Sequence, residues 1–121
     1  MIALATDSVR SADTVNHYVL SWKHRESPTT EQVDEAVTLL QKEMGLEQHQ
    51  IVYGLHADTD NHHLHVVVNR VDPETLRCTE INRGFDIEAG HRAIALIEHR
   101  QGWSREENGL YQVGANGKLI R

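Results

Sequence analysis

The feature that most constrains the fold is a pair of apolar runs separated by a short polar segment. "QIVYGLH", residues 50–56, and "HLHVVVNR", residues 63–70, are rich in the β-branched and aromatic residues that strands favour. The six residues between them, "ADTDNH", allow only a tight connection. We therefore predict that these two runs pair as an antiparallel hairpin.

A strand and a helix are expected before the hairpin. "NHYVLSW", residues 16–22, has the composition of a strand. "ESPTTEQVDEAVTLLQKEMG", residues 26–45, places its apolar residues at helical spacing, with acidic residues on the face predicted to meet solvent. Thr29 and Gln32 fit a capping box at the start of this helix, and Gly45 fits its end.

A second helix is expected after the hairpin, over "FDIEAGHRAIALIEHRQG", residues 85–102. Asp86 is a candidate cap at its start, and Ile87, Ile94 and Ile97 form its apolar stripe. The order strand, helix, strand, strand, helix predicts an α+β fold, an antiparallel β-sheet with helices packed on one face.

The length of 121 residues suits a single domain, residues 1–121. We place its core at residues 15–101 and treat residues 103–121 as a tail, in which "ANGK" fits a hairpin turn.

The composition excludes several classes of protein. Cys78 is the single cysteine, so a disulfide framework and a cysteine-based zinc site are excluded, and a cytoplasmic location is expected. The apolar run at the N-terminus, Met1 to Ala5, is too short for a signal peptide or a membrane span, so no membrane partner is expected. A net charge of −6 weakens the case for a polyanionic partner without excluding one.

Histidines gather in the predicted hairpin, which holds four of the nine in the chain. Strand alternation puts His63 and His65 on one face, about 7 Å apart at Cα, and a hairpin brings His56 beside them. Three imidazoles with a fourth position open are typical of a catalytic metal site. Asp58 is either a turn former or a carboxylate that orients His56.

Two stretches resemble motifs of a known family. "HADTDNHHLHVVVN" resembles the histidine motif of the conjugative relaxases, which are HUH endonucleases of the VirD2-like and TraI-like class. "HYVLSWKHRESPT" is similar to a second relaxase motif, a strand that ends in a serine near the scissile DNA. The resemblance runs from about residue 15 to residue 101 and implies a relaxase-like sheet, truncated at its N-terminal side.

The resemblance implies a metal-dependent enzyme that nicks one strand of a plasmid or conjugative transfer origin through a tyrosine nucleophile. It implies that His56, His63 and His65 bind one divalent ion, Mg, Mn, Zn or Ni, and that Asp58 helps to activate the nucleophile. It also implies that Ser21 contacts the DNA near the nick. The expected partners are single-stranded origin DNA and the accessory proteins of a relaxosome.

Basic residues at the ends of the predicted strands are candidates for contact with DNA phosphates. Lys23 and Arg25 follow the strand that ends in the serine motif, and Arg70 follows the histidine strand.

The sequence departs from the family pattern at the nucleophile. The first fifteen residues contain no tyrosine, Tyr18 and Tyr53 are expected to pack in the core, and Tyr111 falls in the tail. We therefore expect a chain that lacks the first strand and the tyrosine-bearing segment, and that does not nick DNA by itself. A missing strand would leave an unpaired sheet edge, which predicts a homodimer.

Three other readings remain open from the sequence. The first is a non-catalytic module that binds metal and single-stranded DNA. The second is a cupin-type barrel, although Asn69 and Arg70 stand where that class needs a glutamate, and two helices are unlike a barrel. The third is a structural α+β domain whose histidines bind nothing.

Overall fold

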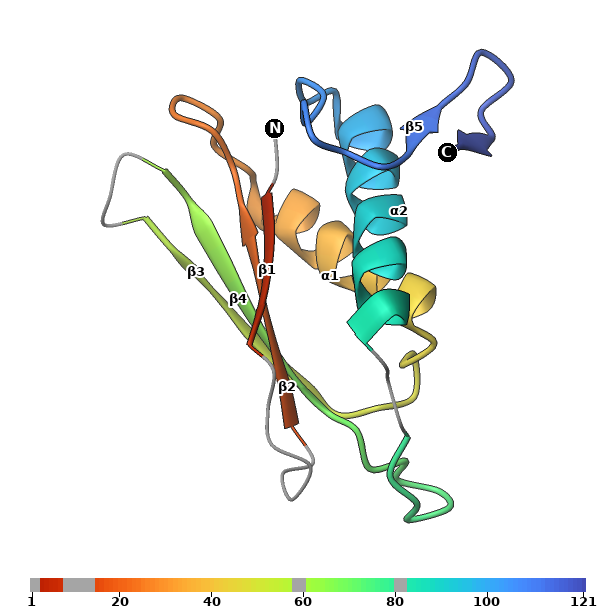
Figure 1. Ribbon diagram of the computed structural model, residues 1–121. Coiled ribbons are helices and arrows are strands. Elements are labelled where there is room, and N and C mark those ends of the chain that lie inside the picture. The colour runs from red at the N-terminus through yellow and green to blue at the C-terminus, as the bar shows by residue number, and fades with distance from the viewer. Residues whose placement is uncertain (1–2, 8–14, 58–60, 80–82) are drawn as a thin grey trace.

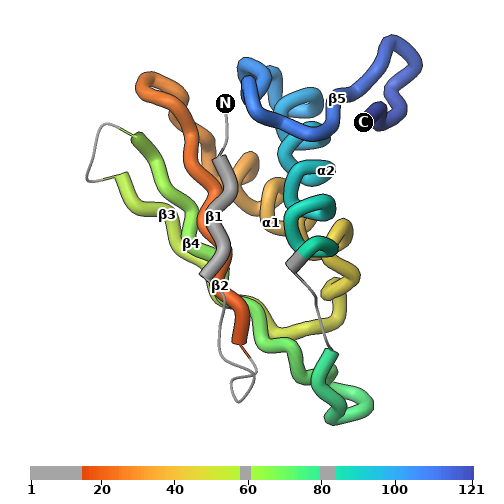
Figure 2. The backbone as a smooth tube through the Cα atoms, in the orientation of Figure 1, coloured from red at the N-terminus to blue at the C-terminus, as the bar shows by residue number. Residues whose placement is uncertain are grey.

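The computed structural model describes residues 3–7, 15–57, 61–79 and 83–121 (Figure 1). In chain order the elements are β1 (Ala3–Asp7), β2 (Val15–Ser21), α1 (Thr30–Met44), β3 (Ile51–His56), β4 (His63–Asn69), α2 (Arg83–Gln101), β5 (Gln112–Val113) and β6 (Leu119–Ile120). Strands β1 to β4 form one sheet, and both helices lie on the same side of it (Figures 1 and 2). The α+β class with helices on one face is confirmed.

The four-stranded sheet has the order β1-β2-β4-β3, and every neighbouring pair is antiparallel. The predicted hairpin is confirmed as β3 and β4, with His56 opposite His63 and Gly54 opposite His65. On its other side β4 pairs with β2, where Ser21 lies opposite His63. The serine motif and the histidine motif are therefore neighbours in the middle of the sheet.

Strand β1 was not expected from the sequence. It pairs with β2 along its whole length, from Ala3 opposite Ser21 to Asp7 opposite His17. The expectation of a missing strand beside β2 is therefore wrong, and so is the unpaired edge at that position on which the homodimer was predicted. The edge next to the histidines is formed instead by β3.

The core lies between the sheet and the two helices. Its sheet side is formed by alternate residues of the two central strands, Tyr18, Leu20, Leu64, Val66 and Val68. Its helix side is formed by Val33, Ala36, Val37, Leu40 and Met44 of α1 and by Ala89, Ala93, Ile94 and Ile97 of α2. Because strand residues alternate between faces, the residues in between point away from the helices.

The predicted ends of α1 are confirmed, but the predicted start of α2 is not. Thr29 and Gln32 form both hydrogen bonds of the capping box, and Gly45 ends α1 in the left-handed conformation, at a φ of 72°. Helix α2 begins at Arg83, and Asp86 lies inside its first turn. Asp86 does not cap the helix because its carboxylate is buried and accepts a hydrogen bond from the Tyr18 hydroxyl.

The apolar stripe of α2 also differs from the prediction. Ile94 and Ile97 are buried as expected, but the side chain of Ile87 is 39% exposed. Ala89 and Ala93 fill the stripe instead, because α2 packs closely against α1 and the sheet at those positions.

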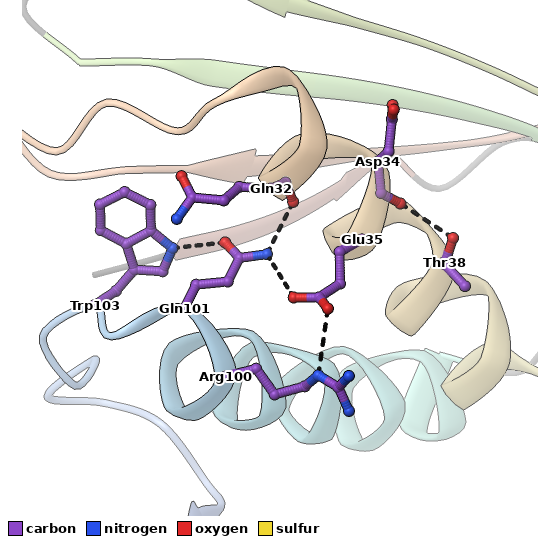
Figure 3. Close-up of polar contacts among 7 residues, drawn as sticks. All are labelled: Gln32, Asp34, Glu35, Thr38, Arg100, Gln101 and Trp103. Carbon is purple, nitrogen blue, oxygen red and sulfur yellow. Dashed lines mark hydrogen bonds and ion pairs between the residues drawn. The ribbon is translucent and has the colours of Figure 1, made fainter.

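Polar side chains join the two helices at the end of α2 (Figure 3). Gln101 donates from Nε2 to the carbonyl oxygen of Gln32, at 2.9 Å, and to Oε1 of Glu35, at 3.1 Å. It accepts from Nε1 of Trp103, at 2.8 Å, while Arg100 forms an ion pair with Glu35. The acidic face of α1 is therefore partly used against α2, and is not the purely solvated surface that the sequence suggested.

The C-terminal tail forms a second, two-stranded sheet from β5 and β6. The predicted "ANGK" turn is confirmed, because Gly114 donates to the carbonyl oxygen of Lys118 and Gly117 takes a φ of 79°. Strand β5 packs against α2. None of the helices in the described part of the chain is both long enough and apolar enough to span a membrane.

Candidate functional site

The sheet face that points away from the helices carries four histidines, His17, His56, His63 and His65, and is called the histidine face. The register puts His56 and His63 directly opposite each other, and His65 lies two residues along β4 on the same face. The neighbouring strand β2 contributes His17 and Ser21 to this face, because they pair with Val67 and His63 of β4. The three histidines predicted as ligands therefore share one face, as their alternation in the sequence indicated.

The imidazole of His65 lies between two others. Its ring centroid is 4.7 Å from that of His56, at an interplanar angle of 61°, and 5.2 Å from that of His17, at 24°. Burial, followed by the charges that His56, His17 and His63 would carry, lowers the pKa of His65. The lowered pKa favours the neutral imidazole, which is the form that can bind a metal.

The two histidines of β4 are both held through Nδ1. The hydroxyl of Ser21 lies 2.9 Å from Nδ1 of His63, and Nε2 of His17 lies 3.0 Å from Nδ1 of His65. A neutral imidazole whose Nδ1 carries the proton and donates it in this way presents the lone pair of Nε2 to a ligand. Histidine ligands in metal sites are commonly oriented by such a second hydrogen bond.

His17 is the site residue that the sequence reading missed. Its position four residues before Ser21 gives it the same strand parity, and this parity was the available sign that it shares the histidine face.

Histidine nitrogens are suitable ligands for a divalent metal, but the histidine side chains do not surround one common point. Among the described residues, no three His, Cys, Asp or Glu side chains converge closely enough to hold one ion. The ring of His65 is stacked on that of His17, so coordination requires the rings to turn about their side-chain bonds. Asp58, the predicted acidic partner, lies outside the described residues.

The predicted DNA-contacting basic residues fall at two different ends of the sheet. Lys23 and Arg25 are exposed in the turn after β2, next to the end of the sheet where Ser21 meets His63. Arg70 follows the opposite end of β4, seven residues from His63, which corresponds to roughly 23 Å along a strand. The structure therefore brings Lys23 and Arg25 toward the histidines, and it does not bring Arg70 there.

Tyr18 lies on the helix side of the sheet, within the core. Its hydroxyl donates to Oδ1 of Asp86, at 3.3 Å, and accepts from Nδ2 of Asn16, at 2.9 Å. Burial is the main cause that raises the pKa of Tyr18 to about 12. This hydroxyl is therefore held protonated, as expected of a packing residue and not of an activated nucleophile.

The other two tyrosines also lie away from the histidine face. Tyr53 is opposite the buried Val66, and its hydroxyl donates to Oδ1 of Asp34 in α1, at 2.7 Å. Its side chain is 40% exposed, so the expectation that it belongs to the core is wrong, because β3 is an edge strand. The ring centroid of Tyr111 lies 5.7 Å from Cζ of Arg92 in α2 and 5.8 Å from Cζ of Arg121. All three tyrosines of the chain thus lie on the helix side.

The sheet has helices on one face and a His-x-His strand beside a strand that ends in serine, which is the arrangement that the resemblance to relaxase nucleases implies. Residues 1–103 match the family model described as "Relaxase: MobA/VirD2-like, nuclease domain". The chain belongs to this relaxase family, in agreement with the resemblance of its two motifs.

The chain is also similar to curated proteins. The protein MobA of Acidithiobacillus ferrooxidans is 62% identical over 121 residues, which are 100% of this chain and 30% of that protein. A protein TraI of Escherichia coli is 32% identical over 97 residues, 80% of this chain and 13% of that protein. The chain thus spans less than a third of the length of these relatives. No solved structure matches the chain closely.

Proposed function

We propose that this chain forms the metal-binding and DNA-binding face of a mobilisation relaxase, the enzyme that nicks one strand at a transfer origin. The observation that carries the proposal is that His56, His63 and His65 lie on one face of the sheet. In addition, Nδ1 of His63 and Nδ1 of His65 each lie within hydrogen-bond distance of another side chain. A structural domain has no need to gather four imidazoles on an otherwise open sheet face.

His56, His63 and His65 would hold the divalent ion, which would be Mg, Mn, Zn or Ni. When bound, the ion acts as a Lewis acid that stabilises negative charge on the scissile phosphate. The hydroxyl of Ser21 fixes the ring of His63, and the ring of His17 fixes that of His65. The role expected for Ser21 as a DNA contact therefore includes holding a ligand in place.

Single-stranded origin DNA would lie across the histidine face. Lys23 and Arg25 are exposed at the Ser21 end of this face, where they can contact phosphates on either side of the scissile bond. We propose that Asp58 helps to activate the nucleophile. We do not include Arg70 in the DNA contact because of its position at the far end of β4.

We do not assign the nucleophile to Tyr18, Tyr53 or Tyr111, because all three lie on the helix side of the sheet. We propose that this chain alone binds a divalent ion and single-stranded DNA without forming a phosphotyrosine link. A covalent adduct between a tyrosine of this chain and DNA would overturn this part of the proposal. The alternative of a non-catalytic module would be favoured if supplying a tyrosine-bearing segment from a relative restored no nicking.

The proposal is tested by metal and DNA binding of the native chain and of His63→Ala. Mn²⁺ should raise the melting temperature of the native chain, and a fluorescent mixed-sequence single-stranded oligonucleotide should bind it in the presence of Mn²⁺. His63→Ala should lose most of the Mn²⁺ effect, because one ligand is removed. A native chain whose melting temperature does not respond to any of the four metals would support the purely structural reading.

Two further partners belong to the same proposal. Accessory proteins of a relaxosome would act on the bound origin together with this chain. A second copy of the chain would pair along one of the two edge strands of the sheet, β1 or β3, and light scattering at high concentration tests whether it does.

A further inference from the structure

Gly54 occupies an unusual place in the sheet. It lies in the interior of β3, directly opposite His65, and it is on the histidine face together with Val52 and His56 of its own strand. A glycine inside a strand lacks a side chain to pack and loses more conformational freedom on folding than any other residue. The presence of glycine at this position of the strand therefore calls for an explanation.

Neither the backbone conformation nor the packing around position 54 explains why this residue is glycine. Gly45, Gly102 and Gly117 take the positive φ that favours glycine, whereas Gly54 does not. A Cβ atom built at Gly54 would meet no atom of the described residues within 4 Å. At Gly114, by contrast, a Cβ atom would lie 2.6 Å from Cδ1 of Ile120, so a side chain there would require Ile120 to move. Position 54 would therefore accept a side chain in the structure as it stands.

The absence of a side chain at position 54 leaves space next to the central imidazole of the cluster. The ring of His65 is contacted by His17 from β2 and by His56 from the end of β3, and no atom of the described part of the chain occupies the position between His56 and Val52. Because β3 is the edge strand on this side, the space is open to the edge of the sheet. A ligand can therefore reach His65 by passing over the backbone of β3.

We propose that Gly54 is part of the DNA-binding site and leaves the room through which one nucleotide of the bound single strand crosses β3 to reach the histidines. The proposal rests on the proposed function, since it assumes that single-stranded DNA lies on this face. A sugar and phosphate can approach a strand backbone closely only where no side chain stands between them. On the next rung of the sheet, Val52 is 73% exposed opposite Val67, which is 37% exposed, and this apolar surface can receive the adjoining base or sugar.

The test is a series of increasing size at one position, Gly54→Ala, Gly54→Val and Gly54→Leu. Each variant is measured for its melting temperature, for the shift produced by Mn²⁺, and for affinity toward a fluorescent mixed-sequence single-stranded oligonucleotide. Leu55→Phe is the matched control, because it adds bulk to the same strand at a 38% exposed position, on the face opposite the histidines.

We expect Gly54→Val and Gly54→Leu to weaken oligonucleotide binding roughly tenfold or more, as extra methyl groups do in a filled contact. Gly54→Ala should weaken it by about threefold or less, since smaller volume changes are absorbed more easily. Leu55→Phe should leave it unchanged, because its side chain lies on the other face of β3. The Mn²⁺ shift should stay the same in all variants. The melting temperature of Gly54→Val should not fall, because valine favours a strand more than glycine does. A purely structural role would therefore move stability, whereas the proposed role moves DNA affinity alone.

Two results would overturn the inference while leaving the proposed function intact. The first is native affinity for the oligonucleotide in Gly54→Leu. The second is a loss of the Mn²⁺ shift in Gly54→Leu equal to its loss of DNA affinity, which would place the effect at the metal site. If the native chain binds neither Mn²⁺ nor the oligonucleotide, the proposed function fails and this inference fails with it.

Discussion

Replacing His17 by phenylalanine tests how the histidine face is built. The phenyl ring can stay stacked on His65, as the imidazole is at 5.2 Å between centroids, but it removes the hydrogen bond of 3.0 Å to Nδ1 of His65. Loss of such an outer hydrogen bond to a histidine ligand typically lowers metal affinity by about 10- to 100-fold. We therefore expect His17→Phe to bind a divalent ion at least about tenfold more weakly than the native chain.

The expected size of the effect can be worked out for a melting experiment. An ion at about 100 times the native dissociation constant stabilises the folded chain by ~2.7 kcal/mol, and a tenfold weaker site retains ~1.4 kcal/mol. For a domain of this length, 1 kcal/mol corresponds to roughly 4 °C in melting temperature. The shift produced by the ion should thus fall from roughly 11 °C in the native chain to roughly 6 °C in His17→Phe.

The assay compares melting temperatures across a Mn²⁺ titration and after addition of EDTA. His99→Phe is the matched control, because it makes the same chemical change at an exposed position on α2, in the helix layer. His17→Gln should recover part of the shift, since its side-chain oxygen can accept from Nδ1 of His65. A native-sized shift in His17→Phe would refute the positioning role, and complete loss of the shift would show that His17 is itself a ligand.

Three further predictions concern stability, each measured as the free energy of unfolding in urea. Leu64→Ala should cost about 2–5 kcal/mol, because this fully buried side chain anchors β4 between two histidines; a cost below about 1 kcal/mol would contradict the core assignment. Gln101→Ala should cost about 1–2 kcal/mol, because its hydrogen bonds join α2 to α1 and to Trp103; Gln112→Ala is the exposed control. Burial raises the pKa of Asp86, so its stabilising contribution is complete below the unfolded pKa near 3.8 and is lost as pH rises through the raised value. Asp86→Asn should therefore be more stable than the native chain at neutral pH, with the difference closing toward pH 3–4; a difference that does not vary with pH would contradict the shift.

Local patterns predicted the parts of the fold that depend on alternation. The parity of His63 and His65 against Leu64 and Val66 was correct, because a residue's face in a strand follows from its number alone once one face is apolar. The capping box at Thr29 was correct for a similar reason, since both of its partners lie within one turn of chain.

The predictions that were wrong concern features that depend on which elements become neighbours in the fold. Strand β1 is short, and it is defined by its pairing with β2 and not by a pattern of its own. Asp86 fits a helix cap in the sequence, but the fold places Tyr18, 68 residues away, where it binds the carboxylate inside the core. Tyr53 fits a core strand, but the strand order leaves β3 at an edge. Gly54 shows nothing unusual until the register sets it opposite His65.

The strand order also resolves the conflict between the acidic composition and a DNA partner. A net charge of −6 describes the whole chain, but DNA would meet only one face of it. On the helix side Glu35 and Glu43 form ion pairs with arginines of α2. The open face of β2, β3 and β4 carries histidine, serine, asparagine, glycine and valine, and no carboxylate among its described strand residues. A bound divalent ion adds positive charge at its centre. The proposed DNA partner would therefore meet strands β2, β3 and β4 on a face whose described strand residues include no carboxylate, and its binding should weaken as salt screens the proposed phosphate contacts to Lys23 and Arg25.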